Sequence, residues 1–81
     1  MSKEKEFKTI LVKEGLADWR IKKTNSGGGL VIWKIKTILL QDINNKAMFL
    51  HELSHVITKK SHDSIFADKF TELVDKYFNN K

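Results

Sequence analysis

The chain has 81 residues, a net charge of +5 and no cysteine. The length predicts one small domain spanning residues 1–81, and the lack of cysteine excludes disulfides, thiolate metal ligands and a cysteine nucleophile. The longest apolar runs, 30–33 and 38–40, are too short to cross a bilayer, and the N-terminal residues lack the apolar core of a signal peptide. We therefore expect a cytoplasmic protein with no membrane segment. Its lysines are mostly scattered, which is typical of a solvated surface.

An amphipathic helix is expected from Lys3 to Glu14. Phe7, Ile10 and Leu11 recur there at helical spacing. Gly15 follows directly and is a usual helix stop, because glycine adopts the left-handed conformation that ends many helices.

The next segment, residues 18–29, predicts a strand followed by a turn. Trp19 and Ile21 alternate with charged neighbours, as in a half-buried strand. The glycine-rich run 26–29 most simply makes a hairpin connection. It does not predict a phosphate-binding loop, since no Lys-Ser/Thr pair and no helix follow it.

Residues 30–41 are rich in β-branched and apolar side chains. They form either one long bent strand or two strands that turn near 34–36. Short connections favour hairpins, so we expect a small antiparallel-type sheet of three strands.

Two helices are expected after the sheet. The first runs from about Asn45 to Thr58, and its candidate N-caps are Asp42, Asn44 and Asn45. Its apolar residues cover most of its circumference, which predicts a buried helix: Phe49, Leu50, Leu53, Val56 and Ile57.

The last helix is expected from His62 to about Phe78, with Ser61 as its cap and Asp63 in its first turn. Steps of four and three along it define one apolar stripe, made of His62, Phe66, Phe70, Leu73 and Tyr77. The predicted fold class is therefore α+β: an N-terminal helix, a small three-stranded sheet and two C-terminal helices.

All three histidines of the chain fall in a short region, at His51, His55 and His62. Residues four apart on a helix stack on one face about 6 Å apart along the axis, so His51 and His55 can share one tetrahedral zinc ion. Glu52 is rotated about 100° from His51, which suits a general base acting on water held by the metal better than a ligand. This is the division of labour in HExxH metallopeptidases.

A catalytic zinc needs a third protein ligand and an open position. His62 is the preferred candidate, because the returning helix would bring it beside the first two histidines. Glu72 is the alternative ligand, ranked lower because it lies roughly 80° off the stripe of His62.

An alternative interpretation of the histidine motif is that it arose by chance and that its members are only hydrogen-bonded core residues. Two observations favour zinc instead. Glu52 lies in an apolar helix with no lysine or arginine between residues 47 and 58, and burying an unpaired carboxylate is costly. No histidine lies outside the cluster.

At these residues the chain resembles a family. HELSHVITKKSHDSIF is similar to the core of the SprT-like and WLM-type zinc metallopeptidases, in which HELxH precedes a third histidine followed by Gly or Asp and then Phe. The matching residues are His51, Glu52, His55, His62, Asp63 and Phe66. The strand-rich run before the motif and the helix after it extend the resemblance to about residues 15–78. It implies a zincin-like minimal core and a zinc-dependent metalloendopeptidase whose general base is Glu52.

The expected cofactor is thus Zn²⁺, and the expected partner is a protein or peptide substrate lying extended along the edge of the sheet. Tyr77 has suitable chemistry for an oxyanion donor, although a tyrosine on an apolar stripe is usually part of the core. One alternative function is a non-catalytic, zinc-stabilised domain that binds a partner. Another is weak nucleic-acid association through the basic surface, with which Trp19 and Trp33 are compatible. The sequence specifies neither the substrate nor the oligomeric state.

Overall fold

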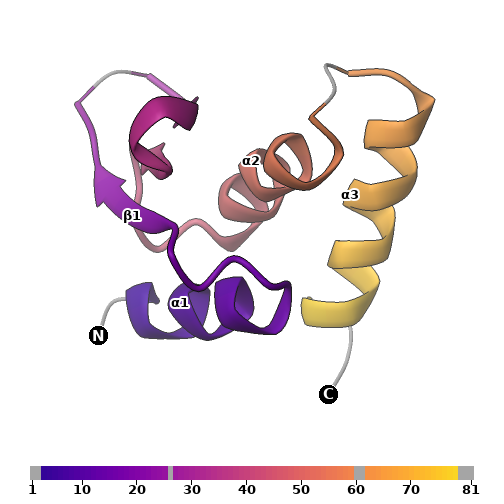
Figure 1. Ribbon diagram of the computed structural model, residues 1–81, viewed down its shortest axis with the longest axis horizontal. Coiled ribbons are helices and arrows are strands. Elements are labelled where there is room, and N and C mark those ends of the chain that lie inside the picture. Colours follow the sequence, from indigo (N-terminus) through magenta and orange to yellow (C-terminus); the bar gives the residue numbers. More distant parts are fainter. Residues whose placement is uncertain (1–2, 26, 60–61, 79–81) are drawn as a thin grey trace.

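The computed structural model describes residues 3–25, 27–59 and 62–78, and it confirms the predicted α+β fold class. Its elements are α1 (Glu4–Lys13), β1 (Arg20–Lys23), β2 (Gly29–Ile32), the 3-10 turn η1 (Trp33–Ile35), β3 (Thr37–Leu40), α2 (Lys46–Thr58) and α3 (Ser64–Tyr77). Helix α2 lies between the sheet and α3, and α1 packs across one end of this arrangement (Figure 1). Within the described ranges, no helix is both long and apolar enough to cross a membrane.

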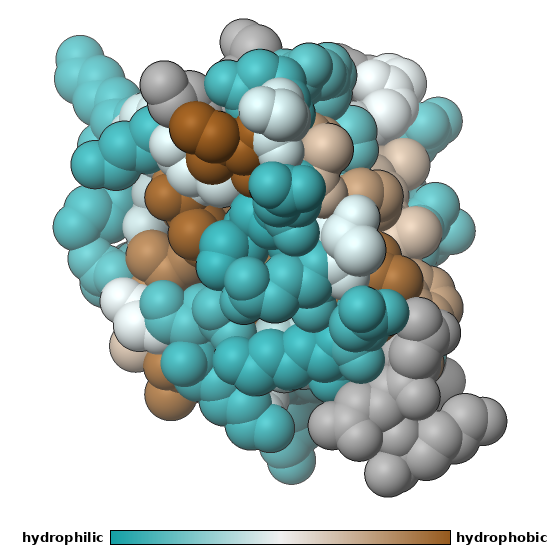
Figure 2. Space-filling model, turned by 90° about the vertical axis from the view of Figure 1, so that its right-hand side faces the viewer, coloured by the Kyte–Doolittle hydropathy of each residue, from teal (hydrophilic) through white to brown (hydrophobic). Residues whose placement is uncertain are grey.

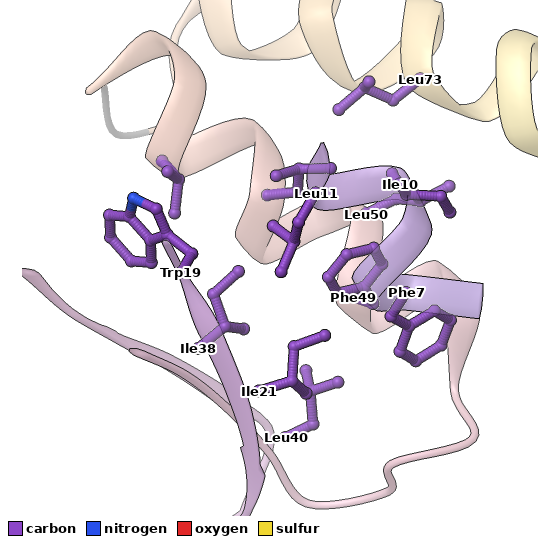
Figure 3. Packing of buried hydrophobic residues seen from close by; sticks show 12 residues of the cluster. Phe7, Ile10, Leu11, Trp19, Ile21, Ile38, Leu40, Phe49, Leu50 and Leu73 are labelled. Carbon is purple, nitrogen blue, oxygen red and sulfur yellow. The ribbon is translucent and has the colours of Figure 1, made fainter. Parts of the chain in front are cut away.

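The N-terminal helix forms and ends as the sequence predicts. Its buried face carries Phe7, Ile10 and Leu11. The chain leaves the helix through Gly15 in a left-handed conformation, with φ of 78°. Phe7 stacks on Phe49 of α2 with ring centroids 4.3 Å apart, which fixes α1 against α2 (Figure 3).

The sheet is mixed and has the order β1-β3-β2. Strand β3 pairs in parallel with β1 and antiparallel with β2, so that Ile38 lies opposite both Ile21 and Val31. Of the two alternatives for residues 30–41, the structure therefore has two strands, joined by η1 and by Lys36 with φ of 50°.

The predicted hairpin between the first two strands is wrong. The glycine run does not join neighbours: it carries the chain from one edge of the sheet to the other. The reason is burial, because TILL of β3 is almost wholly buried and takes the centre, whereas RIKK of β1 carries three basic residues that suit an edge. Chain proximity favoured the hairpin, and the need to bury β3 on both sides outweighed it.

Helix α2 is anchored at its start by Asn45, whose Oδ1 accepts a hydrogen bond of 2.9 Å from the Met48 amide. Phe49, Leu50 and Leu53 are fully buried. They belong to one apolar cluster that also includes Leu11 of α1, residues of β1 and β3, and Leu73 of α3 (Figure 3). This packing holds the motif helix rigidly at the centre of the molecule.

Helix α3 begins two residues later than predicted. Its N-cap is Asp63, whose carboxylate accepts a 2.9 Å hydrogen bond from the Phe66 amide. The predicted cap, Ser61, lies outside the described residues. Phe66 and Leu73 face the interior as expected, while the outer side of α3 is largely hydrophilic (Figure 2).

Candidate metal centre

The three histidines converge. One ring nitrogen from each of His51, His55 and His62 lies within 4.8 Å of the others, so the group can hold a metal ion. The three pairs of ring centroids are 4.9–5.0 Å apart, and the Nε2 atoms of His51 and His62 are separated by 3.0 Å. The first two rings come from one face of α2, and the third comes from the segment just before α3.

This spacing suits a tetrahedral ion. Zinc–nitrogen bonds of 2.0–2.1 Å at tetrahedral angles place the ligand nitrogens roughly 3.3 Å apart. The observed 3.0 Å between His51 and His62 is close to that separation, and the candidate nitrogen of His55 lies within 4.8 Å of the other two. The donor set, three imidazoles, is one that catalytic zinc sites use.

His62 reaches the cluster by a different local structure from the one predicted. The sequence places it on the apolar stripe of the last helix, but it precedes that helix and is exposed. The correction has a physical cause: the Asp63 carboxylate caps the helix, so the residue before it lies outside the helical spiral. The imidazole then turns back onto His51, and the expected convergence is retained.

Phe66 supports all three rings. Its own ring centroid lies 5.0 Å from that of His51, 4.4 Å from that of His55 and 5.0 Å from that of His62. The side chain is only 5% exposed, and the backbone amide is the one that Asp63 caps. One residue therefore links the helix cap to the position of every candidate ligand. The sequence marks Phe66 as a stripe residue but gives no sign of this triple contact.

Burial favours the metal-binding form of His51. It lowers the pKa of this imidazole below the ordinary value of 6.5, and positive charge on His55 or His62 lowers it further. A neutral ring has a free lone pair, which is the form that coordinates a metal.

Glu52 lies beside the cluster without belonging to it. The residue is 8% exposed, and burial raises the pKa of its carboxyl above 4.5, an effect that His55 and His62 partly oppose. In the described part of the chain it forms no ion pair with lysine or arginine, as the sequence predicts. Within the described residues, its carboxylate is thus an acid-base group without a lysine or arginine partner, and it lies next to three candidate ligands.

An open groove of about 420 Å³ runs past His51 and Glu52. Its other lining residues are Gly28, Gly29, Asn45, Ala47, Met48 and Phe70. The groove gives a ligand access to one side of the centre, between the start of α2 and the start of β2.

The remaining candidates lie away from the centre. Glu72 is exposed and pairs with Lys69 at 3.1 Å, so the structure does not bring it to the histidines. The Tyr77 hydroxyl donates a hydrogen bond to the Glu14 carboxylate, on the side of α3 that faces α1. Trp19 is buried in the core, whereas Trp33 is 46% exposed beside it.

Comparisons with protein-family models, with curated proteins and with solved structures find no match. The resemblance to SprT-like and WLM-type peptidases therefore rests on the motif residues themselves.

Proposed function

We propose that this protein is a zinc metallopeptidase that hydrolyses peptide bonds with Glu52 as its general base. The observation that carries the proposal is the convergence of three histidine nitrogens within 4.8 Å, with a buried carboxylate on the adjacent position of the same helix. A purely structural zinc site needs the first feature and has no use for the second.

His51, His55 and His62 would hold the ion. When bound, zinc supplies Lewis acidity, which makes water more acidic and polarises a peptide carbonyl. Phe66 contacts all three rings and would keep them together.

Glu52 would accept the proton of the attacking water and pass it to the leaving amine. Burial raises the pKa of this carboxyl, which moves it toward the neutral range where a general base transfers protons most effectively. The absence of a lysine or arginine partner in the described chain leaves the carboxylate available for this exchange.

A substrate would enter along β2. This strand pairs with β3 on one side, and its other side is an edge of the described sheet. β2 also contacts α2, and the groove beside Glu52 begins at Gly28 and Gly29. An extended peptide that added to this edge would pass directly by the candidate centre.

The test is metal analysis of the purified protein together with cleavage of unstructured proteins and peptide libraries by the wild type and by Glu52→Gln. We expect one zinc per chain in both proteins. Loss of the general base should slow hydrolysis by about 10²–10⁴-fold. Tight zinc binding without cleavage, unchanged by Glu52→Gln, would refute the peptidase and leave a structural site.

That outcome would favour the second candidate, a non-catalytic domain that zinc stabilises and that binds a partner. The supporting observation is a set of exposed apolar side chains on β2 and η1: Leu30, Trp33 and Ile35, which are 46–60% exposed. Exposed apolar groups that lie together are typical of interaction surfaces. Basic residues lie nearby, so the same assay should include a nucleic-acid binding measurement as a control.

A further inference from the structure

The Glu52 side chain packs directly onto the backbone of Gly29, across the space where any other residue would have a Cβ atom. A Cβ at Gly29 would lie 2.8 Å from both Cγ and Oε2 of Glu52 and 2.9 Å from its Cδ. Ordinary contacts between carbon atoms are about 3.5–4.0 Å, so no side chain fits there while Glu52 keeps its position.

The glycine is required for space and not for backbone conformation. Gly29 does not have a positive φ, in contrast to Gly28, with φ of 79°. Gly27 also lacks a positive φ and would meet nothing within 4 Å, which makes it a matched control on the same segment.

The backbones of Gly29 and Glu52 are both held in place, so they are not free to move away from each other. Gly29 pairs with Leu40 in the sheet, and Gln41 makes two hydrogen bonds with Gly28. The backbone amide of Gln41 donates a hydrogen bond to the Gly28 carbonyl at 3.0 Å, and the side-chain Oε1 of Gln41 accepts one from the Gly28 amide at 3.1 Å. On the other side, the fully buried Leu50 and Leu53 fix α2. A clash must therefore be relieved by rotation of the Glu52 side chain.

We propose that Gly29 is a positioning residue: its missing side chain sets the place of the Glu52 carboxylate beside the histidine cluster. The functional consequence rests on the proposed peptidase, whereas the steric coupling does not.

The first measurement compares Gly29→Ala with Gly27→Ala. Misplacement of a reacting group by about 1 Å costs on the order of 10²-fold in rate, so kcat for peptide hydrolysis should fall by that factor in Gly29→Ala. Zinc stoichiometry and affinity should stay at the wild-type level in both variants, because the atoms nearest to a Cβ at Gly29 belong to Glu52 and a Cβ at Gly27 would meet nothing within 4 Å. Gly27→Ala should retain wild-type kcat.

The second measurement is a double-mutant cycle in melting temperature at fixed zinc concentration, which needs no activity. Glu52→Ala removes the three atoms that would lie nearest to the new Cβ, which are Cγ, Cδ and Oε2 of Glu52. In wild type, Gly29→Ala should lower Tm by roughly 5–15 °C, the size of an overpacking effect in a small domain. In the Glu52→Ala background the same change should be neutral or raise Tm, because alanine loses less backbone entropy than glycine in a strand.

An equal fall in Tm in both backgrounds would overturn the proposal, and so would wild-type kcat in Gly29→Ala. If wild type cleaves no peptide but the cycle shows the change of sign, Gly29 still positions Glu52 and the peptidase function fails by itself. The two failures are thus distinguishable.

Discussion

Replacing Phe66 by leucine tests whether the candidate ligands depend on a shared apolar support. The phenyl ring lies 4.4–5.0 Å, centroid to centroid, from each of the three imidazoles and is 5% exposed. Leucine keeps an apolar side chain but loses the flat surface against which the rings pack. We expect a loss of about 1–2 kcal/mol in unfolding free energy, well below the 3–5 kcal/mol of a buried Phe→Ala change.

The effect on the metal should exceed the effect on the fold. Residues that orient ligands typically contribute 10–100-fold to metal affinity, and Phe66 contacts all three candidates at once. Zinc affinity is measured by competition with a chromophoric chelator, and stability by thermal melting. Ile65→Ala is the control, since this neighbour on the same helix is 53% exposed. Wild-type zinc affinity in Phe66→Leu, with only the stability lowered, would refute the supporting role.

Two further predictions concern the third ligand and the acid stability. In the same competition assay, His62→Ala should lower zinc affinity strongly and Glu72→Ala little, and the reverse ranking would move the third ligand to Glu72. Burial pushes the pKa of Glu14 up, but hydrogen bonds, led by that from Tyr77, outweigh it and hold the pKa below 4.5. Because the folded-state pKa is lowered, this contribution is present above about pH 4.5 and is lost as pH falls through the folded value. Glu14→Gln should therefore reduce Tm at neutral pH and make the decline of Tm below pH 4.5 less steep. Parallel Tm–pH curves for wild type and Glu14→Gln would contradict the lowered pKa of Glu14.

The helices could be predicted because their signals are local. Gly15 and Asn45 end and begin helices through contacts within one turn, and the periodicity of Phe7, Ile10 and Leu11 needs no knowledge of the rest of the chain. The pairing of the strands is a different problem. It depends on which strand the helices bury, and the parallel pairing of Ile21 with Ile38 follows from that competition and not from chain proximity.

The site was predictable to the same extent. His51 and His55 share a face by helix geometry alone, and the sequence suffices to find them. His62 was expected in the cluster for a reason that the structure does not bear out, since the cap at Asp63 excludes it from the helix. The contact of Glu52 with Gly29 joins segments far apart in the chain, and a glycine in a run of three gives no signal of which one is required for space.

The arrangement around α2 would let one short motif serve the three purposes proposed for it, which are metal binding, placement of a base and packing of the core. Successive helical residues point about 100° apart, so His51, Glu52 and Leu53 face different neighbours. The first meets the ring of Phe66, the second meets Gly29 of β2, and the third is fully buried in the core. Because these neighbours belong to separate elements, metal affinity, base position and fold stability should respond to different substitutions. Changes at Phe66 should act mainly on the metal, and changes at Gly29 mainly on the base. Variants that altered both in equal measure would mean that α2 itself moves, contrary to its packing.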